Sequence, residues 1–141
     1  MTPMDETKRY QQGMKIRRAV LGDEHVDRAV AATTDFNRDF QNFITRCAWG
    51  EIWACPGLPR HTRSLLTLAM MVALNRGEEF RLHVKAAFSN GVTRDQIKEV
   101  LLHSAIYCGV PAANSAFHIA ADVFKEMDGE TKSNSKKRSR P

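Results

Sequence analysis

Apolar side chains recur at intervals of three and four residues through most of this chain, and no stretch shows the strict alternation of a β-strand. Phe36, Phe40 and Phe43 are one example, because these steps place side chains on one face of a helix. Glycine and proline divide the pattern into seven segments: 3–21, 23–32, a third from Phe36 towards Trp49 and Trp53, 59–76, 77–90, a sixth that opens at Thr93 and ends at Gly109, and 111–127. The sequence therefore predicts an all-α fold of about six to seven helices.

The positive charge of the chain is concentrated near its C-terminus. Residues 129–141 hold five basic residues against Glu130, a net charge of +4, which leaves +1 of the total +5 for residues 1–128. The length of 141 residues fits one domain. We therefore expect a helical domain over residues 1–128 and a basic, disordered tail over residues 129–141. Because the domain lacks a strong positive field, we do not expect it to bind nucleic acid.

Cysteine content and hydropathy indicate the compartment. Cys47, Cys55 and Cys108 are odd in number and contain no CxxC pair, which favours reduced cytoplasmic thiols over a disulfide framework. The first 13 residues lack the apolar centre of a signal peptide. The longest apolar run, Leu65–Leu74, is too short to cross a bilayer and predicts a buried helix.

The segment Pro59-Arg60-His61-Thr62-Arg63 places up to three positive groups in the first turn of a predicted helix. A helix N-terminus already has a partial positive charge, so these cations are unfavourable there unless an anion binds. The alternative is that the side chains extend into water or pair with distant acids. From charge alone the two interpretations are equally weighted.

Glu99, His103 and Tyr107 follow one another in steps of four on the predicted sixth helix. A carboxylate, an imidazole and a phenol along one face could deliver a proton. The competing interpretation is a solvated surface with an ordinary Glu–His pair, and without further information it is favoured.

His83 lies four residues after Glu79 and could titrate near neutral pH, although many such histidines have only a structural role. The five histidines show no spacing typical of metal ligands, so we expect no metal site. Trp49 and Trp53, also four residues apart, could form an apolar wall of a small pocket. Packing in the core or at a subunit interface is the favoured alternative for at least one of them.

Together these residues resemble the carboxymuconolactone decarboxylase family. The likeness covers Tyr10 to Met127 and rests on short motifs in a fixed order. They are Arg17–Asp23 (RRAVLGD), Trp49–Trp53 (WGEIW), Arg-x-x-Arg from Arg60 to Arg63, His83 followed by Ala-x-x-x-Asn-Gly-Val-Thr, Glu99 in Ile-Lys-Glu-Val, and Tyr107–Ala113 (YCGVPAA). The resemblance implies an alkylhydroperoxidase D-like helical bundle that assembles into a ring-shaped homo-oligomer, a hexamer.

The resemblance also implies a function. We expect decarboxylation of 4-carboxymuconolactone to β-ketoadipate enol-lactone and carbon dioxide, in protocatechuate catabolism, with no cofactor. The small-molecule partner would be this dicarboxylate lactone. The alternative is a thiol-dependent alkylhydroperoxidase-like antioxidant protein. That activity uses a CxxC pair, whereas here Pro111 stands three residues after Cys108, and no adjacent resolving thiol exists.

On this hypothesis Arg60 and Arg63 bind carboxylates, since guanidinium groups match carboxylate geometry. His83 delivers a proton or stabilises the oxyanion, Glu99 tunes or orients that acid, and Tyr107 holds the lactone. Trp49 and Trp53 form the apolar wall. Three further residues are weaker candidates for the site: His61, His103 and Cys108.

Overall fold

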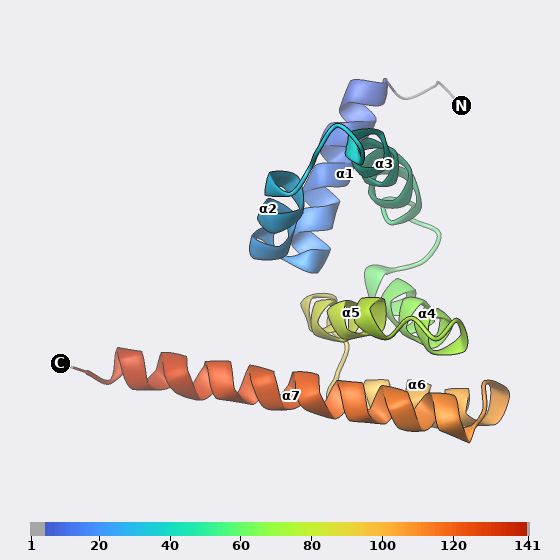
Figure 1. The fold of residues 1–141 in the computed structure, drawn as a ribbon, viewed down its shortest axis with the longest axis vertical. Coiled ribbons are helices and arrows are strands. Elements are labelled where there is room, and N and C mark those ends of the chain that lie inside the picture. Colours follow the sequence, from blue (N-terminus) through green and yellow to red (C-terminus); the bar gives the residue numbers. More distant parts are fainter. Residues whose placement is uncertain (1–4, 141) are drawn as a thin grey trace. The chain divides into compact units, whose positions relative to one another are not determined.

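The computed structural model describes residues 5–140, and within them every regular element is a helix (Figure 1). The elements are α1 (Glu6–Leu21), α2 (Asp23–Ala31), α3 (Arg38–Ile44), the π-helix η1 (Thr45–Ile52), α4 (Arg60–Ala73), α5 (Gly77–Ser89), α6 (Arg94–Tyr107) and α7 (Val110–Arg138). The predicted all-α class is confirmed for the described residues. None of their helices is long and apolar enough to cross a membrane.

Contacts within the chain divide it into two units. The first consists of Met1–Ser64 with Ala86–Gly91, and the second of Leu65–Lys85 with Val92–Pro141. Helices α4 and α5 therefore each contribute residues to both units.

Two glycines allow α1 to pack tightly against η1 in the first unit. A Cβ atom on Gly13 would overlap the carbonyl oxygen of Thr45, and one on Gly50 would lie 2.5 Å from the carbonyl oxygen of Arg9. Only a residue without a side chain fits at such a distance. The core formed beside this contact comprises Ile16, Val20, Trp49 and Ala86.

The third predicted helix changes its hydrogen-bonding pattern along its length. After α3, the backbone adopts the wider π-helical turn from Thr45 to Ile52, and the N–H of Trp53 donates to the carbonyl of Ala48, five residues earlier, at 2.9 Å. Side-chain periodicity does not distinguish an α-turn from a π-turn, so the sequence predicted an uninterrupted helix. The close contact of the η1 backbone with α1 accompanies the change.

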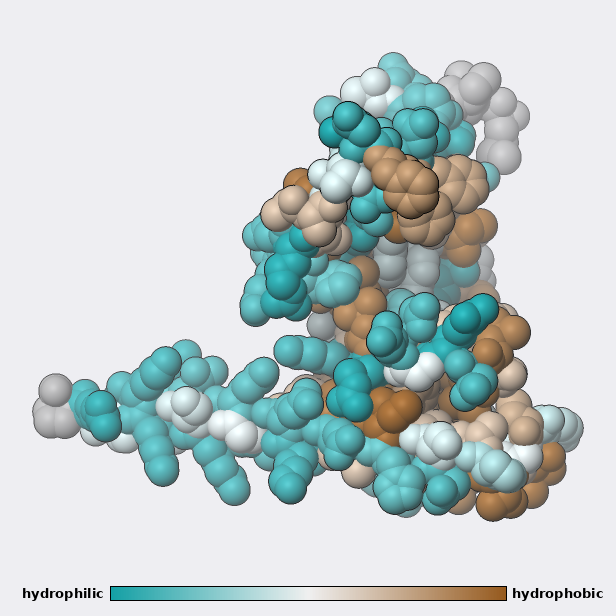
Figure 2. All heavy atoms as spheres, viewed as in Figure 1, coloured by the Kyte–Doolittle hydropathy of each residue, from teal (hydrophilic) through white to brown (hydrophobic). Residues whose placement is uncertain are grey.

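The aromatic face predicted from Phe36, Phe40 and Phe43 exists but is not covered by the chain. These side chains are 98%, 60% and 54% exposed. Figure 2 shows apolar side chains gathered on the surface around α3. An exposed apolar patch of this kind is typical of a surface that binds another molecule.

In the second unit, α6 packs on α7. Ala113, Ala116 and Ala120 are buried on α7, where small side chains allow neighbouring helices to approach closely. Thr93 and Gln96 form the predicted capping box at the start of α6, with the Gln96 N–H donating to Thr93 Oγ1 at 3.2 Å.

The last helix is longer than predicted. The sequence predicts that it ends near Met127 and that a disordered tail follows, whereas the structure continues α7 to Arg138 as an exposed, hydrophilic helix (Figure 2). The Lys85 ammonium lies 3.8 Å from Glu130, and basic residues in the last turn interact favourably with the C-terminal helix dipole. A boundary of the domain at residue 128 stays a prediction.

Candidate functional site

The predicted anion-binding segment lies at the start of α4. The carbonyl of Pro59 accepts the N–H of Arg63 at 3.1 Å, so Pro59 directly precedes the helix. No acidic residue occupies the first turn to balance Arg60, His61 and Arg63. The N-terminal turn of α4 therefore combines its partial positive charge with cationic side chains, as the sequence predicted.

The two arginines of this turn differ in their surroundings. Arg63 is half-buried, and its Nη2 donates to the carbonyl oxygen of Cys55 at 3.1 Å, which fixes the guanidinium against the preceding loop. Arg60 is exposed, and His61 is half-buried. Arg63 is thus the better positioned of the two, and Arg60 has more freedom to reach a ligand.

The two tryptophans stack on each other in the first unit. Their ring centroids are 5.1 Å apart with an interplanar angle of 29°. Trp49 is only 6% exposed and belongs to the core, whereas Trp53 is half-buried. Trp49 therefore has the packing role that was the favoured alternative, and Trp53 is the one with ring surface to offer a ligand.

In the second unit, Glu99, His103 and Tyr107 lie along one exposed face of α6. The rings of His103 and Tyr107 are in contact, with centroids 4.9 Å apart at 36°. Ile106 and Tyr107 are 79% and 78% exposed. In the single chain these residues lie on the solvent-exposed surface. They could act in catalysis only if another molecule covered this face of α6.

His83 and Cys108 occupy more sheltered positions. His83 is half-buried on α5 beside the fully buried Val84. Cys108 ends α6, where its N–H donates to the carbonyl of Ser104 at 2.7 Å. Cys47, Cys55 and Cys108 are all free thiols. Among the described residues, no three His, Cys, Asp or Glu side chains are grouped as a metal site would require.

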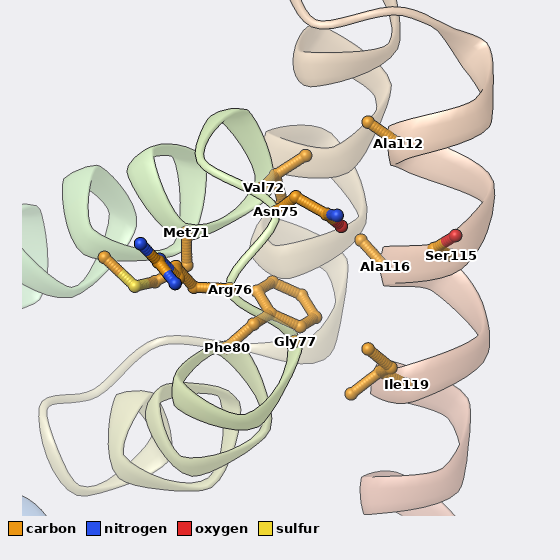
Figure 3. Close-up of a pocket in the computed structure, with 10 residues that line it drawn as sticks. All are labelled: Met71, Val72, Asn75, Arg76, Gly77, Phe80, Ala112, Ser115, Ala116 and Ile119. Carbon is orange, nitrogen blue, oxygen red and sulfur yellow. The ribbon is translucent and has the colours of Figure 1, made fainter.

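A small cavity in the second unit lies between the end of α4, the start of α5 and α7 (Figure 3). Its volume is about 20 Å³, room for about one water molecule and far less than an organic substrate needs. Phe80 and Asn75 point towards α7, and Arg76 and Met71 point away. None of the predicted site residues lines it, and we interpret it as a packing defect.

A feature that the sequence did not reveal is the burial of Arg17 on α1. This side chain is 5% exposed and lines a groove of about 330 Å³ with residues of α1, α2, α3 and η1. The helical pattern does contain a signal, because Arg17 follows Ile16 and precedes Val20 by three residues, both of which are buried. A cation adjoining the apolar stripe of a helix indicates either an extended side chain or a buried charge, and periodicity alone does not separate the two.

Comparison with known proteins identifies relatives over most of the chain. The model of the Carboxymuconolactone decarboxylase family matches residues 38–122. A 4-carboxymuconolactone decarboxylase from Acinetobacter baylyi is 54% identical over 124 residues, which cover 88% of this chain and 92% of that protein. A 4-carboxymuconolactone decarboxylase sequence from Pseudomonas putida is 58% identical over 48 residues, which cover 34% of this chain and all of that sequence.

A fungal protein of different substrate is also similar. A nitrosuccinic acid decarboxylase from Metarhizium robertsii is 41% identical over 118 residues, which cover 84% of this chain and 82% of that protein. The three similar proteins named here are decarboxylases, two of them named for 4-carboxymuconolactone and one for nitrosuccinic acid.

Proposed function

The chain belongs to the carboxymuconolactone decarboxylase family, and we propose that it is a lyase that decarboxylates 4-carboxymuconolactone to β-ketoadipate enol-lactone. The observation that carries this proposal is the near full-length likeness to a bacterial enzyme of that name. The cationic side chains in the first turn of α4, which contains no acidic residue, support it, because the substrate has two carboxylates.

The chemistry of the substrate requires no cofactor. When the carboxylate leaves as carbon dioxide, the electron pair of the broken C–C bond moves through the ring double bond to the carbonyl oxygen of the lactone. The resulting oxyfuran anion is delocalised, and protonation of the ring carbon next to the lactone carbonyl gives the product. The protein must hold the carboxylates, stabilise the oxyanion and supply the proton.

We assign carboxylate binding to Arg60 and Arg63. Arg63 is held by the carbonyl of Cys55, and this contact fixes the direction of its guanidinium. The partly exposed ring of Trp53 would supply the apolar wall that weakens the solvation of the departing carboxylate. The core position of Trp49 gives it the task of supporting Trp53 through the stacked contact.

We assign proton delivery or oxyanion stabilisation to His83, and orientation of that acid to Glu99. Tyr107 would hold the lactone. The half-buried position of His83 suits a residue that must exclude competing water, whereas Glu99 and Tyr107 are exposed in the single chain. These two roles depend on a covering surface.

That requirement links the site to assembly. We propose a ring-shaped homo-oligomer, a hexamer, in which apolar side chains left exposed by the single chain are covered. The support is the number of large apolar side chains at its surface, among them Phe36, Phe40 and Phe43 around α3, and Ile106 on α6. The three free thiols fit a reducing compartment, and we place the enzyme in the cytoplasm.

The second candidate substrate is nitrosuccinic acid, favoured by the fungal relative. It is also a dicarboxylic acid, and its nitro group can accept the electrons that remain after carbon dioxide leaves. In both substrates the electron pair can therefore be delocalised away from the carbon that carried the leaving carboxylate, onto the lactone carbonyl in one and onto the nitro group in the other. The greater identity to the bacterial enzyme favours the lactone.

The test is direct. Purified protein, with no cofactor added, is given 4-carboxymuconolactone or nitrosuccinic acid, and carbon dioxide and the organic product are measured. We expect rapid turnover of the lactone and slow or no turnover of the nitro acid. Turnover of the nitro acid alone would contradict the substrate assignment, and hydroperoxide reduction that a Cys108→Ser variant abolishes would contradict the reaction class.

A further inference from the structure

Arg17 is a buried cation without a counter-ion. Among the described residues its partners are neutral: Nη1 donates to Thr45 Oγ1 at 3.3 Å, and Nη2 donates to Gln41 Oε1 at 3.2 Å. Its Nε is buried and has no hydrogen-bond partner. Of the two bonds that it does make, one is at the upper limit of the usual N–H···O range and the other is just beyond it.

Neighbouring arginines show the normal alternative. Arg18, the next residue on α1, lies 2.8 Å from Asp27 and 3.2 Å from Asp23. Arg28 on α2 lies 2.7 Å from Glu24. Arg18 and Arg28 thus have acidic partners, whereas the described partners of the buried Arg17 are neutral. Removing a charge from water without a partner is costly, so such a group is retained where something else compensates it.

The surroundings of Arg17 form a site rather than a gap in packing. The groove of about 330 Å³ is within the size range of small-molecule pockets. Besides Arg17 it is lined by Arg38 and by residues with polar side chains that can donate hydrogen bonds, including Tyr10 and Asn42. Val30 adds an apolar surface.

Charge in this region is positive on balance. Burial lowers the pKa of the Arg17 guanidinium, which nevertheless stays protonated at neutral pH. Burial, then Arg17 and Arg28, lower the pKa of His25, so this imidazole is neutral near pH 7 and adds no further cation. Arg38 has its own partner in Asp35, which leaves Arg17 as the unneutralised charge of the groove.

We propose that this groove is a binding site for a small carboxylate, with the guanidinium of Arg17 as its charged contact. A carboxylate can accept two parallel hydrogen bonds from a guanidinium, and Nη1 and Nη2 of Arg17 each keep a second N–H after their bonds to Thr45 and Gln41. Donors such as Tyr10 and Asn42 would complete the shell. The inference concerns this groove alone and does not rest on the proposed decarboxylation.

The carboxylate that contacts Arg17 could also be an acidic side chain of a second copy of the chain. We favour the small molecule, because the groove has the volume of a ligand site and a polar lining on several sides. The two sources are separable by experiment, since only one of them depends on added carboxylate.

Adipate, a six-carbon dicarboxylate, is the probe, and dimethyl adipate is its uncharged control. The full chain is titrated at constant ionic strength, with binding followed by calorimetry and by the Tm. We expect adipate, but not its ester, to bind and to raise the Tm progressively. In ¹⁵N-resolved NMR spectra the Nε–H resonance of Arg17 should shift on titration, which a merely structural arginine would not show.

The variants are Arg17→Met, which removes the charge, and Arg17→Lys, which keeps it without the planar fork. Arg17→Met should abolish binding while the Tm without adipate is unchanged or higher. Arg17→Lys should bind at least about tenfold more weakly, the loss of one charged hydrogen bond. Arg28→Gln, an exposed arginine outside the groove, is the matched control and should bind as the original chain does.

Absence of adipate binding in the original chain, or binding that survives in Arg17→Met, would overturn the proposal. The proposal would also be overturned if the original chain does not bind adipate and the Arg17→Met variant sediments as a smaller species than the original chain. The carboxylate that contacts Arg17 would then be a side chain of a second copy. If Arg17→Met does not fold, the NMR titration of the original chain and the Arg17→Lys affinity decide the question.

Discussion

At the scale of single residues, the most informative contrast is between the arginines of α4 and the histidine of α5. Arg63 is held by the Cys55 carbonyl, whereas Arg60 is exposed. His83 is half-buried. The proposed roles therefore affect different kinetic constants.

Arg60→Gln should mainly weaken substrate binding. Loss of one charged hydrogen bond to a carboxylate predicts a KM about tenfold higher or more, with a smaller change in kcat. Because Arg60 is exposed, the Tm should stay within about 2 °C of the original. Steady-state kinetics on the lactone measure both constants, and an unchanged KM would show that Arg60 does not contact the substrate.

His83→Ala and Glu99→Gln should mainly lower kcat. Removal of a general acid predicts a loss of about 10²-fold or more for His83→Ala, and Glu99→Gln should shift the pH dependence of kcat. His118→Gln, an exposed histidine on α7, is the matched control and should keep normal turnover. Near-normal kcat in both variants, with folding confirmed by circular dichroism, would refute these two roles.

His25 should make stability depend on pH. Its pKa is lowered by burial and by two arginines, so the unfolded chain binds the proton first as pH falls below about 6.5. The free energy of unfolding should be fully retained above that pH and decrease as pH falls towards the folded-state pKa. Urea unfolding between pH 8 and 5 should show a shallower decrease for His25→Gln, and parallel curves would contradict the assignment.

At the scale of elements, the contact of α1 with η1 depends on two absent side chains. Gly13→Ala would bring a methyl group onto the Thr45 carbonyl, a backbone atom that cannot rotate away. We expect a loss of at least about 2 kcal/mol in the free energy of unfolding, or failure to fold.

Gly129→Ala is the matched control for this substitution. Gly129 lies in α7 with open space around its Cα, so an added methyl group should stabilise the helix by about 0.5–1 kcal/mol. Chemical denaturation of the two variants gives the comparison. A Gly13→Ala protein as stable as the original would show that α1 and η1 are not so closely packed.

The elements also show what the sequence could and could not predict. The capping box at Thr93, the small-residue packing of α7 and the helical class follow from local rules and were predicted correctly. The π-turn of η1 and the burial of Arg17 depend on which segments pack together in the fold, and side-chain spacing does not predict these tertiary contacts. Of the candidate site, the sequence predicted residues and their local order, while exposure of the α6 face required the structure.

At the scale of the whole molecule, assembly is the property on which most depends. Phe36 is 98% exposed, and an exposed apolar patch such as the one it forms with Phe40 and Phe43 is typical of a binding surface. Phe36→Glu should therefore shift the sedimentation pattern from the proposed hexamer to smaller species. Thr34→Glu, which adds the same charge at a nearby exposed position, is the control. An unchanged mass for Phe36→Glu would show that this surface lies outside the interface.

The wide turn of η1 has a consequence for how this chain tolerates changes in length. A π-helix accommodates an additional residue per turn of hydrogen bonding, so deletion of one residue between Thr45 and Ile52 could be absorbed as ordinary α-helix without breaking the ladder. Because the turn then closes with one residue fewer, the residues that follow would keep nearly the same direction about the helix axis. A deletion between Trp49 and Trp53 would change the spacing of the two indoles and break their stacked contact, whereas the loop that holds the Arg63 guanidinium would start where it does now. A shortened η1 would thus separate the role of the tryptophan stack from that of the loop.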